Sequence, residues 1–446
     1  MLIFTQIASV SPIANRPLGT EQSRIVAVDL THPEDPHILT EAFHAARTPD
    51  ISFDGKRMLF AARKTEEDAW HIWEMNLENR RVKKITDGFE GCTDPAYLPD
   101  GRIVFSASAA PSQETDEKEP FALYTSTRDG SEVERITFHP QSDAATTVLL
   151  DGRVLFVSGG APSSTPFSTL LAMRYDGTGM TLFYQNEQGG RVLSRARETA
   201  EDQLVFVESE EPGSIGGSLV TIDEKRPLHS RVDLAPDVSG RFHSVVPTPS
   251  GKLIVSYRPS SEEPFSLYEF DPSEKRIGRR LHSTTTYHAV EPVLAIERAR
   301  PMGFVSVTDP QQQVGWLYAQ NANLSNLPLA GRRASPVRSR KVQILGRDGL
   351  LGTVPLEEDG SFHVEVPADT PLLFQTLDKD GRVVRGPSSW IWVRPNERRG
   401  CIGCHEDREW VPENIVPLAV KKPPVSLVPS TSLAEAPSST SQPAKQ

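Results

Sequence analysis

Short apolar segments recur along the first two thirds of the chain, and each follows a tight-turn signal. Clear copies are SFDGKRMLFAA (52–62), YLPDGRIVFSAS (97–108) and VLLDGRVLFVSG (148–159), and weaker ones are TAEDQLVFVES (199–209) and PTPSGKLIVSY (247–257). The acidic or serine residue of each turn falls at positions 54, 100, 151, 201 and 250, which gives a period of 46 to 51 residues. A turn of Asp-Gly type that leads into Val, Ile, Leu and Phe is typical of a β-hairpin.

A second strand with an apolar or aromatic stripe follows most copies, as in WHIWEMNL, LLAMRYDG and FSLYEFDP. Small β units of this kind cannot bury both faces alone, and a radial arrangement of four-stranded sheets solves that problem. We therefore predict an all-β fold with a six-bladed β-propeller of TolB or WD40-like type over residues 1–325. The sixth unit begins near 287, and the N-terminal LIFTQIASV supplies a strand that closes the ring with the last blade. No extended segment shows the 3.6-residue period of a long helix.

The repeat ends at about residue 326. Alternating apolar and polar positions between turn signals then predict a small β-sandwich-like domain over 326–396. A cysteine-containing segment follows at 397–423. The last stretch, 424–446, is rich in Ser, Pro and Ala, and we expect it to be disordered because it cannot bury enough apolar surface.

Charge and hydropathy exclude two classes of partner. The formal net charge is -11 and no basic stripe is present, so we expect no nucleic-acid partner. No apolar run approaches the roughly 18–20 residues of a membrane-spanning helix. The N-terminal segment MLIFTQIASVSPIA has no basic residue before its apolar stretch, and we therefore expect a strand there rather than a secretory signal.

The strongest chemical signal is CIGCH at 401–405, in a chain that has only three cysteines. This spacing is that of covalent c-type haem attachment. Two thiols add to the two vinyl groups of one porphyrin, and the adjacent histidine then lies under the iron as its proximal ligand. We therefore predict one covalent haem c, with Cys401 and Cys404 as the thioether pair and His405 as the proximal ligand. Gly403 keeps the linker small against the macrocycle. Cys92, the third cysteine, is expected to be a small buried apolar residue.

Other uses of this motif need weighing. A dithiol redox pair lacks the usual βαβ surroundings, and a structural zinc site needs a fourth ligand that no second cysteine pair supplies. Haem irons of electron-transfer type take a second strong ligand. His363, on a predicted strand of the small domain, is the first candidate, although its neighbours point to the opposite face and it can equally lie exposed without a role. Met302 is a more distant alternative.

Two further histidines precede the inner strands of successive blades. His243 and His288 are expected side by side on one rim of the propeller channel, with Glu291 close by. Two imidazoles and a carboxylate can hold a metal ion or a small ligand. The alternative is a structural position that the repeat carries from blade to blade. Asp54, Asp100 and Asp151 are interpreted as turn formers.

The repeats, YLPDGRIVF in particular, resemble the TolB-type propeller repeat (PD40). The stretch from GTVPLEEDGSFHVEVPAD through SSWIWVRPNERRGCIGCHE to VPENIVPLAV resembles the C-terminal part of proteins related to the hydrazine synthase alpha subunit. The resemblance covers most of residues 1–420. It implies a propeller middle domain before a haem-bearing end, with Cys401, Cys404 and His405 matching the haem motif. The family's additional N-terminal haem domain has no counterpart in the printed sequence, and the haem that matches is the one to which an electron-transfer role is assigned.

Three functions remain open at this point. The first is electron transfer to or from a redox partner protein, which is the function that we expect. The second is a haem enzyme, or a subunit of one, that acts on a small inorganic nitrogen substrate. The third is a propeller binding or scaffold module with a structural haem. Because covalent haem attachment takes place outside the cytoplasmic membrane, we expect a periplasmic or exported protein.

Overall fold

The computed structural model describes residues 1–10, 22–109, 120–159, 168–186, 188–211, 213–330, 337–404 and 413–428. These residues divide into two compact units, Met1–Ser306 and Val307–Gln446. Strands make up almost all regular structure among them, and the all-β prediction is confirmed. Val314–Ala319 is a strand of the second unit. The boundary predicted near residue 326 is therefore about 20 residues too late.

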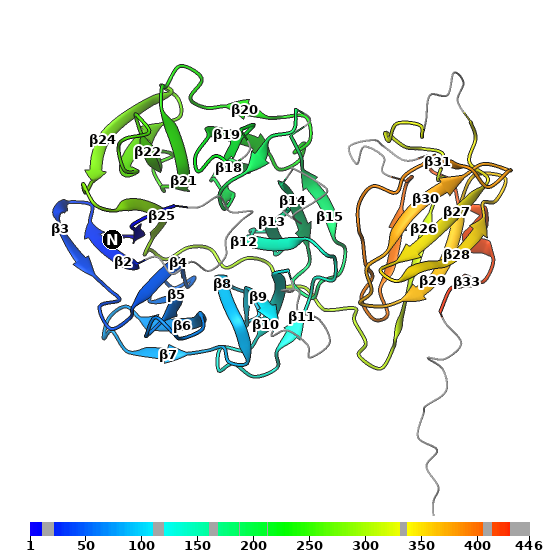
Figure 1. The fold of residues 1–446 in the computed structure, drawn as a ribbon, viewed down its shortest axis with the longest axis horizontal. Coiled ribbons are helices and arrows are strands. Elements are labelled where there is room, and N and C mark those ends of the chain that lie inside the picture. Colours follow the sequence, from blue (N-terminus) through cyan, green and yellow to red (C-terminus); the bar gives the residue numbers. More distant parts are fainter. Residues whose placement is uncertain are drawn as a thin grey trace, which may run out of the picture. The chain divides into compact units, whose positions relative to one another are not determined.

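The described strands of the first unit form six antiparallel sheets around a common centre, the arrangement of a β-propeller (Figure 1). From the inner strand outward, blade 1 comprises β25 (His288–Leu294), β1 (Leu2–Ile7), β2 (Ser23–Asp29) and β3 (His32–Ile38). Blade 2 comprises β4 (Ala45–Ile51), β5 (Arg57–Arg63), β6 (His71–Asn76) and β7 (Val82–Lys84). Blade 3 comprises β8 (Phe89–Tyr97), β9 (Ile103–Ala109), β10 (Ala122–Ser126) and β11 (Glu134–Arg135). Blade 4 comprises β12 (Ser142–Val148), β13 (Val154–Gly159), β14 (Ser168–Met173) and β15 (Thr181–Tyr184). In blade 5, β16 (Arg191–Val192) and β17 (Arg197–Glu198) share the inner position, and β18 (Gln203–Ser209), β19 (Ser218–Asp223) and β20 (Val232–Asp233) follow. Blade 6 comprises β21 (Arg241–Pro247), β22 (Leu253–Arg258), β23 (Ser266–Asp271) and β24 (Arg276–His282). A single pair, Ser23 with Ala45, joins blades 1 and 2 into one eight-stranded sheet.

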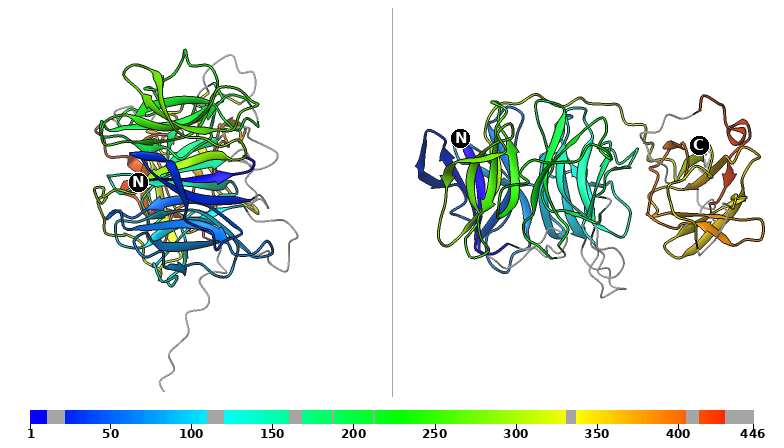
Figure 2. Two further views of the ribbon diagram at one scale, coloured as in Figure 1. Left: turned by 90° about the vertical axis from the view of Figure 1, so that its left-hand side faces the viewer. Right: turned by 90° about the horizontal axis from the view of Figure 1, so that it is seen from above.

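The N-terminal strand closes the ring, as the sequence predicts. β1 pairs antiparallel with β25, from Leu2 opposite Leu294 to Ile7 opposite His288. Residues from the two ends of the propeller therefore share one blade, and the ring cannot open without breaking this ladder. The sheets stand on edge around the axis, as the edge-on view shows (Figure 2).

The predicted turns lie between the inner and second strands of the blades. Gly55, Gly101 and Gly152 have φ between 70° and 92°, a region that glycine enters without a steric penalty. Asp54 accepts hydrogen bonds from the Ser52 hydroxyl and from the Lys56 amide, so it has the predicted turn-forming role. In the fourth copy the glycine is replaced by Asp202, whose φ is 55°. Aspartate tolerates this conformation better than most residues, which explains why the weaker copy still forms a hairpin.

The apolar core of the propeller lies between neighbouring blades. Leu155, Leu170, Phe206 and Val220, for example, pack blade 4 against blade 5 and are all fully buried. Cys92 is fully buried between blades 2 and 3, and burial raises the pKa of its thiol to about 12. It is therefore the inert apolar residue that the sequence predicts.

The second unit is a sandwich of two four-stranded sheets. One sheet has the order β32 (Arg398–Cys401), β26 (Val314–Ala319), β29 (Phe362–Pro367) and β33 (Val425–Ser426); the other has β28 (Gly349–Pro355), β27 (Lys341–Gly346), β30 (Leu373–Leu377) and β31 (Val383–Arg385). Alternate residues of both sheets, among them Leu317, Val364, Ile344 and Phe374, meet in one shared core. A short 3-10 helix, η2 (Leu418–Lys421), packs on β29.

The predicted division of this unit is wrong in two respects. The segment predicted to bind haem is not separate from the small domain, because β32 runs parallel to β26 inside the sandwich sheet. The order of the chain also extends beyond residue 424, because Val425 pairs with Val364 and Leu427 packs against the core. The rest of the predicted disordered tail, from 429, lies outside the described residues.

Candidate functional site

The cysteine motif begins at the end of an edge strand of the sandwich. β32 pairs with β26 so that Gly400 lies opposite Tyr318 and Cys401 opposite Ala319. A Cβ at Gly400 would lie 2.5 Å from the end of the Tyr318 side chain, so a larger residue there would have to displace that ring. Because side chains alternate along a strand, Cys401 shares the core-facing side with the buried Ala319. Its thiol is half-buried and packs against the core.

The turn after β32 is bound to the segment that follows β26. The Gln320 and Asn321 amides donate to the carbonyls of Cys401 and Ile402, both at 2.9 Å, and the Cys404 amide donates to the Leu324 carbonyl at 2.9 Å. Three backbone hydrogen bonds therefore hold the two cysteines at a fixed separation. The Cys404 thiol is also half-buried against the core.

Gly403 has a structural explanation that the sequence analysis missed. A Cβ at this position would lie 2.2 Å from the carbonyl oxygen of Leu324, a distance that no real side chain tolerates. The glycine is therefore required by the neighbouring backbone. Room for a macrocycle, the reason expected from the sequence, is not needed to explain it.

The chain beyond the motif is fastened to the same segment. The Gln320 amide side chain donates to the Glu413 carbonyl at 2.7 Å, so Cys404 and Glu413 both lie against residues 320–324. Leu324, whose carbonyl accepts the Cys404 amide, exposes 37% of its surface, and Ile415 and Val416, which follow Glu413, expose 49% and 66%. His405 lies outside the described residues, and its role as proximal ligand stays a prediction.

The donor set can be tested against covalent haem without any further geometry. Two half-buried cysteines on one hydrogen-bonded turn carry the thiols that thioether formation needs. The exposed apolar side chain of Leu324, a residue bonded to the Cys404 amide, is of the kind that a porphyrin face covers favourably. The residues that are present therefore fit the group.

His363 lies on the other side of the same sheet. It pairs with Tyr318, with the ring centroids 6.3 Å apart, on the face opposite to the one that Cys401 occupies. Its Nδ1 is buried and has no hydrogen-bond partner among the described atoms. Burial lowers the pKa of this imidazole, and the Arg398 charge lowers it further, whereas a hydrogen bond from the ring to the Lys422 backbone raises it. The structure therefore does not bring His363 to the thiols, and its role as distal ligand stays a prediction. The alternative, Met302, belongs to the propeller unit.

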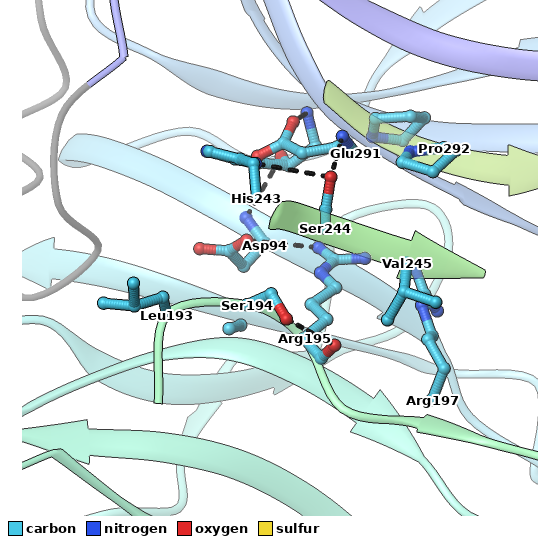
Figure 3. Close-up of a pocket in the computed structure, with 13 residues that line it drawn as sticks. Asp94, Leu193, Ser194, Arg195, Arg197, His243, Ser244, Val245, Glu291 and Pro292 are labelled. Carbon is cyan, nitrogen blue, oxygen red and sulfur yellow. Dashed lines mark hydrogen bonds and ion pairs between the residues drawn. The ribbon is translucent and has the colours of Figure 1, made fainter. Parts of the chain in front are cut away.

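A second candidate site lies on the propeller axis, where a small cavity is lined by side chains from the inner position of every blade (Figure 3). They are Thr48, Pro49, Asp94, Ala145, Leu193, Ser194, Arg195, Arg197, His243, Ser244, Val245, Glu291 and Pro292. Hydrogen bonds run around the cavity from blade to blade. The Glu291 amide donates to Ser244 Oγ at 2.8 Å, and the Thr48 amide donates to Glu291 Oε2 at 2.9 Å.

Both histidines that were expected together pack against Phe265, but only His243 lines the cavity. His243 lines the cavity with Glu291, whereas Nδ1 of His288 accepts the Phe265 amide at 3.1 Å. Their rings pack on Phe265, with centroid distances of 5.3 and 5.6 Å. His288 lies three residues before Glu291, while His243 lies one residue before Ser244, so the expected equivalence was out of register. Within the described ranges, no three His, Cys, Asp or Glu side chains are grouped to hold a metal ion.

The repeat contains a signal for this cavity that the sequence analysis missed. Thr48, Asp94, Ala145, Arg195 and Ser244 each stand six positions before the turn residue of their blade. Four of the lining residues, Thr48, Asp94, Ala145 and Glu291, have φ between 49° and 56° and sit at register shifts of their strands. Such β-bulges turn a side chain away from the regular pleat. The period thus specifies the layer of residues around the axis.

Comparison with known proteins shows which family this chain resembles. Residues 316–406 match the family model of the hydrazine synthase alpha subunit middle domain. The hydrazine synthase subunit alpha of Kuenenia stuttgartiensis is 25% identical over an alignment of 535 residues, which covers 91% of this chain and 65% of that protein. This chain is a distant relative of the hydrazine synthase alpha subunit. It spans about 65% of the length of that relative.

A hydrazine synthase structure from K. stuttgartiensis shares the fold, with a TM-score of 0.81 over 94% of this chain and 71% of that chain at 21% identity. A TolB from Acinetobacter baumannii aligns over 65% of both chains with a TM-score of 0.45. The hydrazine synthase middle-domain match falls on the second unit, from β26 to just beyond the CIGCH motif, whereas the sequence analysis expected the propeller to carry that name. No helix in the described ranges is both long enough and apolar enough to cross a membrane.

Proposed function

We propose that this relative of the hydrazine synthase alpha subunit carries one covalent haem c and transfers electrons to or from a partner protein. Cys401 and Cys404 would form the thioethers, and His405 would be the proximal iron ligand. The observation that carries the proposal is the CIGCH spacing on a turn whose backbone at the two cysteines is held by hydrogen bonds to residues 320–324. When bound, the haem supplies one-electron redox chemistry.

The chain's own residues would position that group. The Cys401 and Ile402 carbonyls and the Cys404 amide are all bonded to neighbouring backbone, so the backbone positions of the two cysteines would be set before any cofactor arrives. The exposed side chains of Leu324, Ile415 and Val416 would exclude water from one side of the macrocycle. The six-bladed propeller would serve as the scaffold that docks the partner. A periplasmic or exported location belongs to the same proposal, because covalent haem attachment takes place outside the cytoplasmic membrane.

The first test is the pyridine haemochrome spectrum of the chain after expression in a periplasm with haem-maturation machinery. We expect a c-type spectrum at one haem per chain that survives acid–acetone extraction. Cys401→Ala and Cys404→Ala should each weaken attachment, and the double variant should abolish it. Cys92→Ala is the matched control, because that cysteine is buried in the propeller and should not affect haem content.

The native spectrum of the same sample tests the electron-transfer part separately. A six-coordinate, low-spin iron agrees with electron transfer, whereas an open sixth position would replace it with a haem enzyme acting on a small substrate. A colourless protein with bound zinc, or haem that extracts completely, would refute the proposal. If partner binding survives unchanged in Cys401→Ala, the binding-scaffold alternative gains support.

A further inference from the structure

The axial cavity of the propeller contains two arginines that one blade supplies. Arg195 and Arg197 occupy the inner position of blade 5, while the other five blades place Thr48, Asp94, Ala145, Ser244 and Glu291 in the layer of Arg195. In Figure 3 the guanidinium of Arg195 lies close to Asp94 and below Ser244. Only 11% and 17% of the Arg195 and Arg197 side-chain surfaces are exposed. Two desolvated positive charges thus lie two residues apart.

The protein satisfies these charges incompletely. Arg195 Nη2 donates to Asp94 Oδ1 at 3.3 Å and to the Pro95 carbonyl at 3.4 Å, but Nη1 is buried and has no hydrogen-bond partner among the described atoms. Arg197 is 3.9 Å from Asp50, which is longer than a hydrogen bond. A buried cationic donor without an acceptor is costly, so an acceptor supplied from outside would be bound favourably.

The nearby carboxylates do not supply the hydrogen-bond acceptors that the two guanidinium groups lack. Asp50 is shared with Arg298, whose Nη2 lies 3.8 Å from it, so Arg197 has no carboxylate of its own. Glu291 Oε2 is occupied by the Thr48 amide and the Thr5 hydroxyl, each at 2.9 Å. Burial is the main cause that lowers the pKa of Arg197 to about 10; the Arg195 charge adds to this effect, and the Asp50 charge opposes it.

We propose that the propeller axis holds a binding site for a small, singly charged planar anion that presents two oxygens to Arg195 and Arg197. A guanidinium is planar and pairs with two coplanar oxygens through parallel hydrogen bonds, which favours a carboxylate or nitrate-like oxyanion over a spherical ion. Asp94 and Glu291 on the cavity wall disfavour a second negative charge. This site is independent of the proposed haem, which belongs to the other unit.

The test uses the full chain and compares sodium formate and sodium nitrate with sodium chloride at equal ionic strength. A ligand that binds only the folded protein raises the Tm with its concentration, and we expect about 2 °C at roughly ten times Kd for a unit of this size. The ¹³C line of labelled formate should broaden in the presence of the wild-type chain. Arg195→Gln and Arg197→Gln should each lose both effects. Arg241→Gln, an exposed arginine paired with Glu211 on blade 6, is the matched control and should keep them.

The arms of this experiment separate the two sources of the anion. A rise in Tm with formate but not with nitrate identifies the ligand as a small carboxylate. A rise with nitrate but not with formate identifies it as an inorganic oxyanion, and either result supports the proposed site. Equal Tm values in all three salts, together with an unbroadened formate line, would overturn it. That comparison needs only the wild-type chain, so it decides the question even if an arginine variant does not fold. A response that Arg195→Gln and Arg197→Gln both retain would also overturn it.

Discussion

A pair of carboxyl groups at the edge of blade 5 makes the stability of the propeller depend on pH. Glu198 ends β17, and its Oε2 accepts the Leu150 amide at 2.8 Å; Glu224 lies within hydrogen-bonding reach. Burial raises the pKa of Glu198 to about 8. The Glu224 charge also raises this pKa, whereas the hydrogen bond from the Leu150 amide lowers it. Burial also raises the pKa of Glu224. One of the two is therefore protonated at neutral pH.

The sign of the effect follows from proton linkage. Between the ordinary glutamate value of 4.5 and about 8, the folded chain binds a proton that the unfolded chain releases. The bound proton stabilises the folded chain fully below pH 4.5, and this stabilisation is lost as the pH rises through about 8. At 1.36 kcal/mol per pH unit the full effect would be roughly 5 kcal/mol. Because the carboxyl is partly exposed, water screens it, and we expect about 1–2 kcal/mol.

The perturbation is Glu198→Gln, which keeps an oxygen for the Leu150 amide but cannot ionise. Urea denaturation followed by circular dichroism at pH 5.5 and 8.5 gives the free energy of unfolding at each pH. The wild-type value should fall by about 1–2 kcal/mol more than that of the variant over this interval. Glu201→Gln, an exposed glutamate in the next turn, should behave like the wild type. Parallel pH profiles for the wild type and Glu198→Gln would refute the reasoning.

Three further predictions concern packing and the second unit. Gly403→Ala should lower the free energy of unfolding by about 1–3 kcal/mol, because its Cβ meets the Leu324 carbonyl, while Gly303→Ala, whose Cβ meets nothing, should change it little in the same urea titration. Phe206→Ala should cost about 3–5 kcal/mol in the propeller transition, since the ring is fully buried between blades 4 and 5; a loss below 1 kcal/mol would contradict the interblade core. Because burial lowers the pKa of His363, the second unit should lose stability as the pH falls below about 6.5, and His363→Gln should flatten that acid limb in circular dichroism melts.

The period of the turns was enough to predict the propeller from the sequence, because each copy combines a turn that needs positive φ with a strand that is buried on both faces. The copy at Asp202 shows why the weak signals could be trusted: the residue differs, but its φ of 55° serves the same turn. Ring closure by residues 2–7 fits the last unit, which begins near 287 but has no Asp-Gly turn that leads into a second strand. These features are local or periodic, and the sequence displays both directly.

The organisation of the second unit was harder to predict because it depends on long-range pairing. β26 lies between β29 and β32, about 50 and 80 residues further along the chain, and two of the three pairings in this sheet, β26 with β32 and β29 with β33, are parallel. Nothing local marks Val314–Ala319 as part of that sheet rather than of the last blade. In the same way, Val425 and Leu427 stand in a Ser- and Pro-rich stretch, and only their pairing with β29 and their packing on the core reveal an ordered strand.

The axial cavity illustrates what a repeat can reveal when its exceptions are examined. Counting six positions back from each turn identifies the residues around the axis, and most of them are small or acidic. Blade 5 departs from this pattern with Arg195 and Arg197 in the sequence SRARE. Packing does not require two buried guanidinium groups at this place, because the equivalent positions of the other blades are filled by Thr48, Ala145, Ser244 and similar residues. Residues that violate a local rule without a structural gain are expected at functional sites. The Arg-Ala-Arg exception therefore points to the propeller axis as a place where this chain binds a ligand, independently of its cysteine motif.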